Sequence, residues 1–360
     1  MAAQPQPTSS GRPMSSTPQL EILDLRHFSA ARLRPLLEEE AERWQQRLRW
    51  DYASAITLLL DYIDGRILPG FVALHAGRVV GYAFCVFEAA KAVVGDVYAF
   101  GEGEQLDNPI CETLLHHLLE MLQATPGVER VESQLLMFPA GALASPFLSR
   151  GFRSYPRLFM TCDLPHSSCH LDQTLSVPSR GKAKRLLHIV AEGRVQPPPM
   201  LTNLVLEPWR PPFYDAAAAL IHHAYTGNVD SNINDQYRSV HGAQRFLHNI
   251  IRFPGCGIFD AEDSWVARDR HTHALEAIIL CSRVRADVGH ITQLCVRPEL
   301  RRAGIAEALL HHCAAHIARR GVSGLSLTVT EANMGALRLY ERNGFSTLHR
   351  FDAMVWDKRF

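Results

Sequence analysis

The sequence predicts an α/β protein built from two similar halves. Strand-like runs alternate with amphipathic helical runs, and the same order of elements begins again at about Leu204. Two pairs of segments agree with a repeat: FLSRGF at 147 matches YERNGF at 340, an offset of 193 residues, and LLHH at 114 matches LLHH at 309, an offset of 195. With 360 residues, of which 47% are hydrophobic, the chain is long enough for two domains with buried cores.

The elements of the first half follow from local patterns. A strand begins at Leu20, two helical stretches reach Trp50 and Tyr62, and a hairpin turns at residues 76–78. We then expect a strand at 93–100, a helix through 111–122, a strand at 128–136, a short helix that ends at Gly151, and a closing strand at 158–164.

The composition excludes several classes of protein. Lys plus Arg equals Asp plus Glu at 37 each, so no global field attracts nucleic acid or an acidic membrane. The eight cysteines are scattered without a Cys-x-x-Cys pair, which predicts reduced thiols, no metal site and a cytoplasmic location. No apolar run has the ~18 residues of a membrane span. Residues 1–18 lack the apolar centre of a signal peptide, and we expect a disordered tail there.

The stretch from His290 to Gly321 carries the strongest functional signal. It predicts a buried strand, a basic turn with Arg301 and Arg302, and an amphipathic helix from about Gly304 to a left-handed cap at Gly321. The first N–H groups of a helix have no internal partner and carry the positive end of its dipole. The turn is therefore a candidate anion site, suited to a pyrophosphate.

The pattern around this turn differs from other phosphate-binding motifs. It has neither the three glycines of the Rossmann fingerprint nor the Gly-Lys-Ser/Thr of a Walker motif. Downstream lie an alternating strand at Leu325–Thr330 and a helix start at Asn333. Together these segments resemble the GNAT superfamily of acyl-CoA-dependent N-acyltransferases. The residues that match its two motifs are Arg301, Gly304 and Ala306, then Asn333, Ala336, Tyr340, Gly344 and Phe345.

The resemblance implies two tandem GNAT-like domains, each a mixed, mostly antiparallel sheet flanked by helices, an arrangement known from mycothiol synthase. We expect a tail at 1–18, a degenerate domain without a cofactor turn at 19–165, a linker at 166–200 and a catalytic domain at 201–360. The first half is degenerate because the repeat offsets put Leu106, Asp107 and Pro109 at the positions of the basic turn. They also put Ala140 and Phe147 at the positions of Asn333 and Tyr340.

The resemblance further implies an N-acetyltransferase that moves an acetyl group from acetyl-CoA to a primary amine, by direct attack in a ternary complex. The residues expected to contact acetyl-CoA are Leu294, Cys295, Val296, Arg301, Arg302, Ala303, Gly304, Ile305, Ala306 and Asn333. Tyr340 matches the position that protonates the leaving sulfur, although a tyrosine there can also be a packing residue. The sequence leaves open a longer acyl group, a hydroxyl acceptor, and a sensor that binds acyl-CoA without turnover.

The general base is less defined. His290 has a suitable ordinary pKa of about 6.5 and shares a strand face with Leu294 if the strand is regular. A hydrogen-bonded histidine at a strand end, with a chain of waters as the base, is the alternative.

The segment from Ala224 to Val240 is the candidate acceptor site, for a small-molecule amine or a peptide. It is polar without apolar periodicity, and Asp230 or Asp235 would attract an ammonium group. The other residues assigned to the acceptor are Tyr225, Asn232, Asn234 and Tyr237. A solvated loop with Asx turns is the alternative reading. The oligomeric state does not follow from the sequence.

Overall fold

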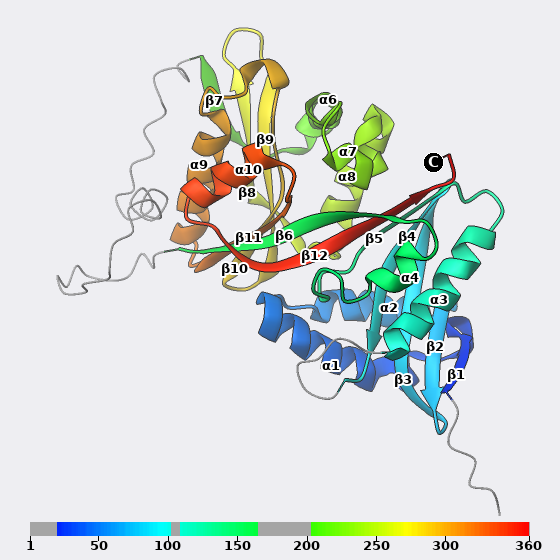
Figure 1. Ribbon diagram of the computed structural model, residues 1–360. Helices are drawn as coiled ribbons and strands as arrows, with labels where there is room; N and C mark the ends of the chain where they lie inside the picture. Colours follow the sequence, from blue (N-terminus) through cyan, green and yellow to red (C-terminus); the bar gives the residue numbers. More distant parts are fainter. Residues whose placement is uncertain (1–19, 102–108, 165–202, 360) are drawn as a thin grey trace, which may run out of the picture.

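The computed structural model describes residues 20–101, 109–164 and 203–359, and its strands form one sheet that runs through the whole molecule (Figure 1). The sheet has twelve strands in the order β1-β2-β3-β4-β5-β12-β6-β11-β10-β9-β8-β7. Two of the neighbouring pairs, β4 with β5 and β10 with β11, are parallel, and all others are antiparallel. The predicted mixed, mostly antiparallel sheet is thus confirmed.

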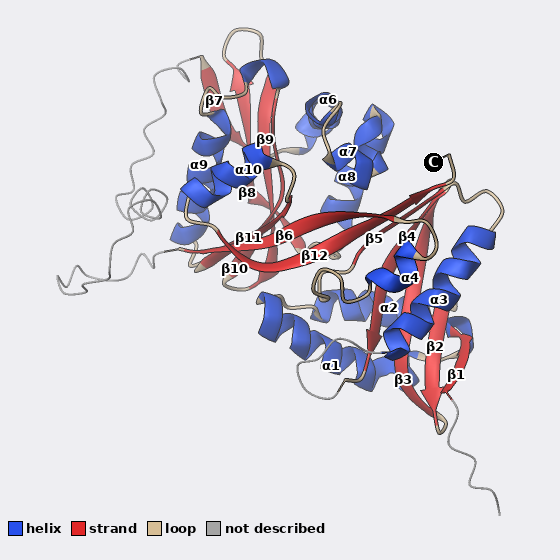
Figure 2. Ribbon diagram, in the orientation of Figure 1, coloured by secondary structure: helices blue, strands red, loops and turns tan. Residues whose placement is uncertain are grey.

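Helices cover both faces of this sheet in each half (Figure 2). The first half contains β1 (Leu20–Asp24), α1 (Ala30–Leu48), α2 (Ala53–Asp64), β2 (Gly70–His75), β3 (Arg78–Glu88), β4 (Lys91–Ala99), α3 (Pro109–Ala124), β5 (Arg130–Gln134), α4 (Ala144–Leu148) and β6 (Arg153–Asp163). The second half contains β7 (Leu204–Pro208), α6 (Tyr214–Tyr225), α7 (Asp230–Ile233), α8 (Val240–Arg252), β8 (Ile258–Asp269), β9 (Leu275–Arg285), β10 (Val288–Val296), α9 (Ile305–Arg319), β11 (Gly324–Thr330), α10 (Met334–Arg342) and β12 (Ser346–Asp357).

The two faces of the second half have separate apolar cores. On one face, α9 and α10 pack on the sheet around fully buried residues such as Leu309 and Ile279. On the other face, α6 and α8 pack around Ile221, Leu247 and Ile278. Two-sided burial explains why β9 reads as a continuous apolar run.

The internal repeat is visible in the strand pairing. β4 pairs with β5 over Lys91–Val94, β10 pairs with β11 over 288–291, and each pair diverges beyond that point. Next to the divergence both β4 and β10 have a bulge against their other neighbour, at Gly95 and at Thr292. The short helices also correspond, since Phe147 packs edge-on against Phe152 as Tyr340 does against Phe345.

The two halves exchange their last strands. β6, from the first half, pairs with β11 of the second half, and β12, from the second half, pairs with β5 of the first. β6 and β12 also pair with each other, so they lie side by side where the halves meet (Figure 1). Each half of the sheet is therefore completed by a strand from the other.

Local sequence patterns located the elements of the first half to within a few residues, and the largest difference is at β6. This strand begins at Arg153, five residues before the expected start at 158. Its first residues are polar and contain Pro156, and they become a strand because β12 pairs with them. The expected tail at 1–18 and linker at 166–200 lie outside the described residues, as do Leu106 and Asp107. No helix in the described part of the chain is long and apolar enough to cross a membrane.

The strand exchange predicts that the halves fold together. Produced separately, fragment 1–165 would carry β6 without either of its neighbours, and fragment 203–360 would carry β12 with none. Unpaired strand edges expose backbone hydrogen-bonding groups. We expect neither fragment alone to show a cooperative thermal transition by circular dichroism, whereas the two co-expressed fragments should co-purify and melt in one transition. Cooperative melting of the isolated 1–165 fragment would contradict this expectation.

Candidate active site

The basic turn between β10 and α9 has the conformation that the sequence predicts. β10 ends at Val296, a 3₁₀ turn covers Pro298–Leu300, and Gly304 caps α9 with φ 84°. Glycine adopts such a positive φ without the strain that a side chain would bring, and so it is favoured there. Gly321, with φ 83°, follows the helix as expected. The Arg301 guanidinium donates to the carbonyl oxygen of Ala224, which ties the turn to the end of α6.

A cleft of about 460 Å³ lies at this N-terminal end of α9. Its walls are the end of β10, the basic turn, the exposed face of α10 and the end of α6. The predicted residues that line it are Tyr225, Leu294, Cys295, Val296, Arg301, Arg302, Gly304, Ile305, Ala306, Asn333 and Tyr340. Ala303 is not among the lining residues and packs against the core below α9.

The strand edge beside the cleft has unused backbone groups. β10 pairs with β11 only as far as Ile291, while its pairing with β9 continues to Val296. From Thr292 on, the side of β10 that faces β11 has no strand partner among the described residues. An extended group in this gap can therefore pair with the backbone of β10 as an added strand does.

The Tyr340 side chain lies at the inner end of the cleft as a protonated phenol. It is 7% exposed, packs on Phe345 and has no hydrogen-bond partner for its hydroxyl in the described part of the chain. Burial raises the pKa of Tyr340 above its ordinary value, and Asp230 and Cys295 raise it further. Burial also raises the pKa of Cys295 to about 12, so this thiol is protonated at neutral pH.

Asp230 connects the segment Ala224–Val240 to the elements that line the cleft. Its carboxylate accepts hydrogen bonds from the Thr330 hydroxyl, at the end of β11, and from the Asn333 amide at 3.1 Å. The Asn333 side-chain oxygen in turn accepts from the N–H of Ala336 and caps α10. Asp230 and Asn333 thus hold the start of α7 against the end of β11 and the start of α10.

The other predicted acceptor residues lie behind the cleft wall. Tyr237 stacks on Tyr225, with ring centroids 4.2 Å apart, and its hydroxyl lies 3.4 Å from the Gln293 oxygen. Asn234 caps the N–H of Gln236 at 3.0 Å. Asn232 accepts from Arg130 through its backbone oxygen, and Asp235 pairs with Lys91, so both face the first half.

His290 does not line the cleft. The residue is 5% exposed, its ring packs against both Trp50 and Phe159, and its Nδ1 lies 2.9 Å from the Ser326 hydroxyl. Burial, aided by Arg157, lowers the pKa of His290 to about 3. The expected shared face with Leu294 requires a regular strand, but the bulge at Thr292 reverses the alternation. Leu294 packs toward α9 with Ile291, whereas His290 faces the first half.

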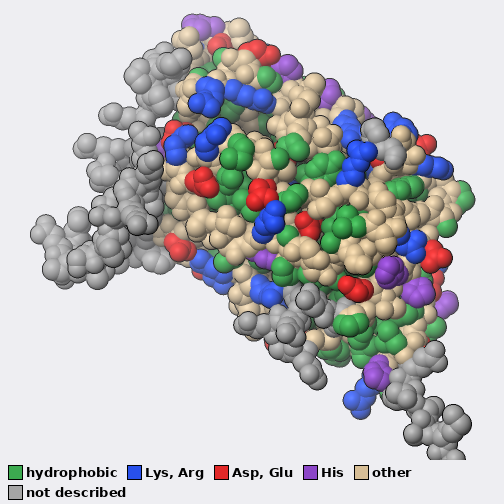
Figure 3. Space-filling view, in the orientation of Figure 1, with side chains coloured by type: hydrophobic (Ala, Val, Ile, Leu, Met, Phe, Trp, Pro, Cys, Tyr) green, Lys and Arg blue, Asp and Glu red, His purple; other side chains and the backbone are tan. Residues whose placement is uncertain are grey.

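Several lining residues were not singled out from the sequence. They are Ala224, Leu300, Glu307, Gly335, Leu339 and Arg342. Those on α10 could have been predicted from the sequence, because residues 335, 336, 339 and 340 share one helical face. Arg342 lies 3.7 Å from Glu307 and adds a third arginine to the cleft. Away from the cleft, basic and acidic side chains are interspersed over the surface seen in Figure 3. No cluster of His, Cys, Asp or Glu within the described ranges is arranged for a metal ion.

Sequence comparison points to one family. Residues 233–345 match the model of the acetyltransferase (GNAT) family. The ribosomal protein bS18-alanine N-acetyltransferase of Escherichia coli (strain K12) is 34% identical over 70 residues, which are 19% of this chain and 47% of that protein. The corresponding enzyme of Shigella flexneri matches equally well. The chain thus spans about half the length of the curated relatives it matches.

Similar solved structures extend over nearly the whole chain. A GCN5-related N-acetyltransferase from Sphaerobacter thermophilus has a TM-score of 0.57 at 17% identity, over 94% of this chain and 96% of that one. A tandem GNAT protein from the clavulanic acid biosynthesis pathway has a TM-score of 0.55 at 13% identity, over 94% of this chain and 99% of that one. At such identities the likeness is one of fold. Residues 233–345 therefore match the acetyltransferase (GNAT) family, in a chain whose fold is that of a tandem GNAT protein.

Proposed function

We propose that the chain is an acetyl-CoA-dependent N-acetyltransferase that acetylates a primary amine by direct attack in a ternary complex. One observation carries the proposal: a single cleft joins an anion-binding helix start, a free strand edge and a buried, protonated Tyr340. Arg301, Arg302 and the N–H groups at the start of α9 suit the pyrophosphate of acetyl-CoA. Acetyl-CoA is a co-substrate here, and it supplies the activated acetyl group as a thioester.

The protein side of the reaction is built from few groups. The amine nitrogen attacks the thioester carbon, the carbon–sulfur bond breaks, and Tyr340 gives its proton to the leaving sulfur. The amine loses its own proton through water, since His290 lies away from the cleft. Asp230 provides negative charge near Tyr225 and Tyr340, which favours an ammonium as the form in which the acceptor arrives. The protonated state of Cys295 argues against an acyl-cysteine route.

The proposal is tested with purified protein, acetyl-CoA and an amine panel, read by thiol release. The panel includes small amines, amino acids, an aminoglycoside, a lysine peptide and a peptide that begins with alanine, because the curated relative is named as an alanine N-acetyltransferase. Matched alcohols and butyryl-CoA test a hydroxyl acceptor and a longer acyl group. Calorimetry should show one acetyl-CoA per chain. Tight binding without thiol release for any acceptor would instead identify a sensor.

The anion site is tested by Arg301→Glu combined with Gly304→Pro. The charge of the turn is reversed, and proline cannot adopt the positive φ of Gly304, so acetyl-CoA binding should fall below detection in calorimetry. Arg319→Glu, at the opposite end of α9, is the charge-matched control and should bind like the parent. Retained binding in the double variant would place the co-substrate elsewhere.

Tyr340→Phe tests the general acid. The ring and its packing on Phe345 are kept while the hydroxyl is lost, so kcat should drop by about 10²–10⁴-fold. The Kd for acetyl-CoA should stay within about twofold, because the hydroxyl acts on the leaving group. Equal kcat values for variant and parent would show that Tyr340 only packs.

We assign His290 a structural role, which has a pH signature. Its folded-state pKa is about 3, whereas in the unfolded chain it titrates near its ordinary value of about 6.5. Its contribution to stability is thus complete above about pH 6.5 and decreases as the pH falls toward 3. We expect thermal unfolding of His290→Asn to depend less steeply on pH between 4 and 7 than that of the parent, with kcat/KM within about threefold. A hundredfold loss of kcat in a folded variant would restore His290 as the base.

A further inference from the structure

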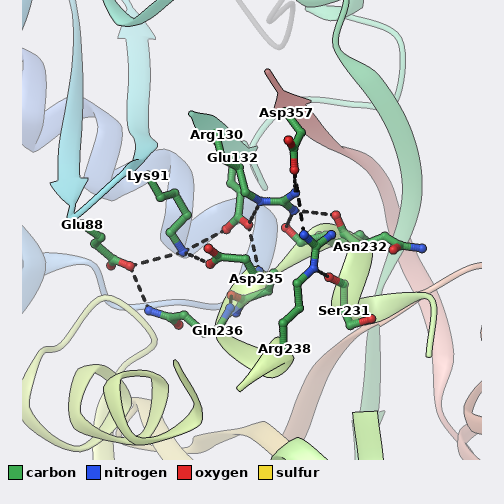
Figure 4. A network of polar contacts seen from close by, with 12 residues as sticks. Glu88, Lys91, Arg130, Glu132, Ser231, Asn232, Asp235, Gln236, Arg238 and Asp357 are labelled. Carbon is green, nitrogen blue, oxygen red and sulfur yellow. Dashed lines mark hydrogen bonds and ion pairs between the residues drawn. The ribbon is translucent and has the colours of Figure 1, made fainter. Parts of the chain in front are cut away.

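A buried network of charged groups joins the first half to the acceptor segment (Figure 4). At its centre is Lys91, 5% exposed, at the start of β4. The ammonium nitrogen lies 2.7 Å from the Asp235 carboxylate, 3.1 Å from Glu132 and 3.2 Å from Glu88. Asp235 belongs to the second half, and the other two carboxylates belong to the first, so Lys91 links the halves by charge.

A second group of contacts runs through Arg130, at the start of β5. Its guanidinium donates to Glu132 at 2.6 Å and to the backbone oxygen of Asn232, also at 2.6 Å. Glu132 also contacts the segment directly, because its carboxylate accepts a hydrogen bond from the Asp235 N–H at 2.9 Å. Gln236, which is 5% exposed, donates to Glu88 at 2.9 Å.

The charges in this network depend on one another. Burial alone would lower the pKa of Lys91, but Glu132, Asp235 and Glu88 together raise it. Burial raises the pKa of Glu132, against the effect of Lys91 and Arg130. A buried ion that loses its partner is strongly destabilised, so removal of Lys91 leaves three carboxylates without their shared cation. The segment that brings in Asp235 would then be repelled.

The same segment supports the cleft wall. Residue 236 is held by Glu88, and the next residue, Tyr237, stacks on Tyr225, which lines the cleft. At the other end of the segment, Asp230 is bound to Thr330 and Asn333. The segment is thus fixed at one end by catalytic elements and at the other by the first half.

We propose that the first half positions the acceptor site of the second half, with Lys91 as the positioning residue that holds the segment Asn228–Ser239 in place. This proposal adds to the proposed function how its acceptor site is held in place, and the kinetic part of its test rests on that function. Lys91 does not touch the cleft, and it acts through Asp235 and the Tyr237–Tyr225 stack. The acceptor it serves is the primary amine, while the acetyl-CoA contacts at the basic turn are independent of it.

The test uses the full chain with Lys91→Met, and Arg49→Met as the matched control. Arg49 also links the halves, through Asp287 and Ser323, but at the opposite end of β10 from the cleft. For Lys91→Met we expect hydrogen–deuterium exchange at least about tenfold faster within residues 228–240. With the best amine of the panel, the acceptor KM should rise at least about tenfold, while kcat and the Kd for acetyl-CoA stay within about twofold. Arg49→Met should match the parent in all of these.

Two further variants keep the test decisive. Lys91→Arg retains the cation and should restore most of the acceptor KM. Asp235→Asn leaves Lys91 paired with Glu88 and Glu132, and it serves if Lys91→Met does not fold; it should show the same local exchange and KM effects.

Unchanged exchange and KM, or equal losses of acceptor and acetyl-CoA binding with uniformly faster exchange, would overturn the positioning role. If no amine is acetylated, the proposed function fails, yet the exchange of residues 228–240 still decides the positioning role by itself.

Discussion

The exchange of β6 and β12 is the constraint on which the arrangement of the molecule depends. A strand inserted between two partners has its backbone groups satisfied on both sides, and here each inserted strand takes a partner from the other half. Neither half can complete its sheet without the other. Hydrogen-bonded backbone therefore fixes the relative position of the halves, and the buried charged network between them has a fixed geometry.

That fixed geometry explains how the first half can affect the chemistry proposed for the second. β12 carries Asp357, which accepts from Arg130 at 3.3 Å, so the exchanged strand itself takes part in the network. The cations Lys91 and Arg130 begin the parallel strands β4 and β5, the pair that corresponds to β10 and β11 in the second half. In the first half, the starts of β4 and β5 contact the second half. In the second half, the cleft lies where β10 and β11 diverge.

The sequence was sufficient where the signal is local. The helix from Ile305 to Arg319, its glycine at the start and the cap by Asn333 depend on spacing and on residues within one turn, and the structure has all of them. The lining of the cofactor side of the cleft follows from the same motifs. The face of the sheet on which His290 lies, relative to Leu294, depends on a one-residue bulge at Thr292. No residue pattern in β10 predicts that bulge. The sequence gives no sign that Asp235 pairs with Lys91, because the two residues lie 144 positions apart. The prediction that Asp235 contacts the acceptor was made without that partner. The strand exchange is likewise invisible in the sequence, because an exchanged strand and an ordinary one have the same pattern.

In the first half, buried polar side chains fill the place where β4 diverges from β5. Where β4 diverges from β5, the buried Asp96 pairs with Glu40 of α1, and Tyr82 and Trp44 donate to the Glu40 carboxylate. Burial raises the pKa of Asp96 to about 6 and that of Glu40 well above its ordinary range, so the pair shares a proton rather than holding two adjacent charges. In the second half, the equivalent part of β10 carries Gln293 and Cys295. There the Tyr237 hydroxyl lies near Gln293, and Cys295 lines the cleft. With one shared proton the pair carries a single negative charge, and Tyr82, Trp44 and the Val97 N–H donate to its oxygens, so this end of the first half satisfies its own polar groups. The polar contacts of the first half with the second then lie at the opposite end of β4 and β5, where Lys91 pairs with Asp235 and Arg130 donates to the backbone of Asn232.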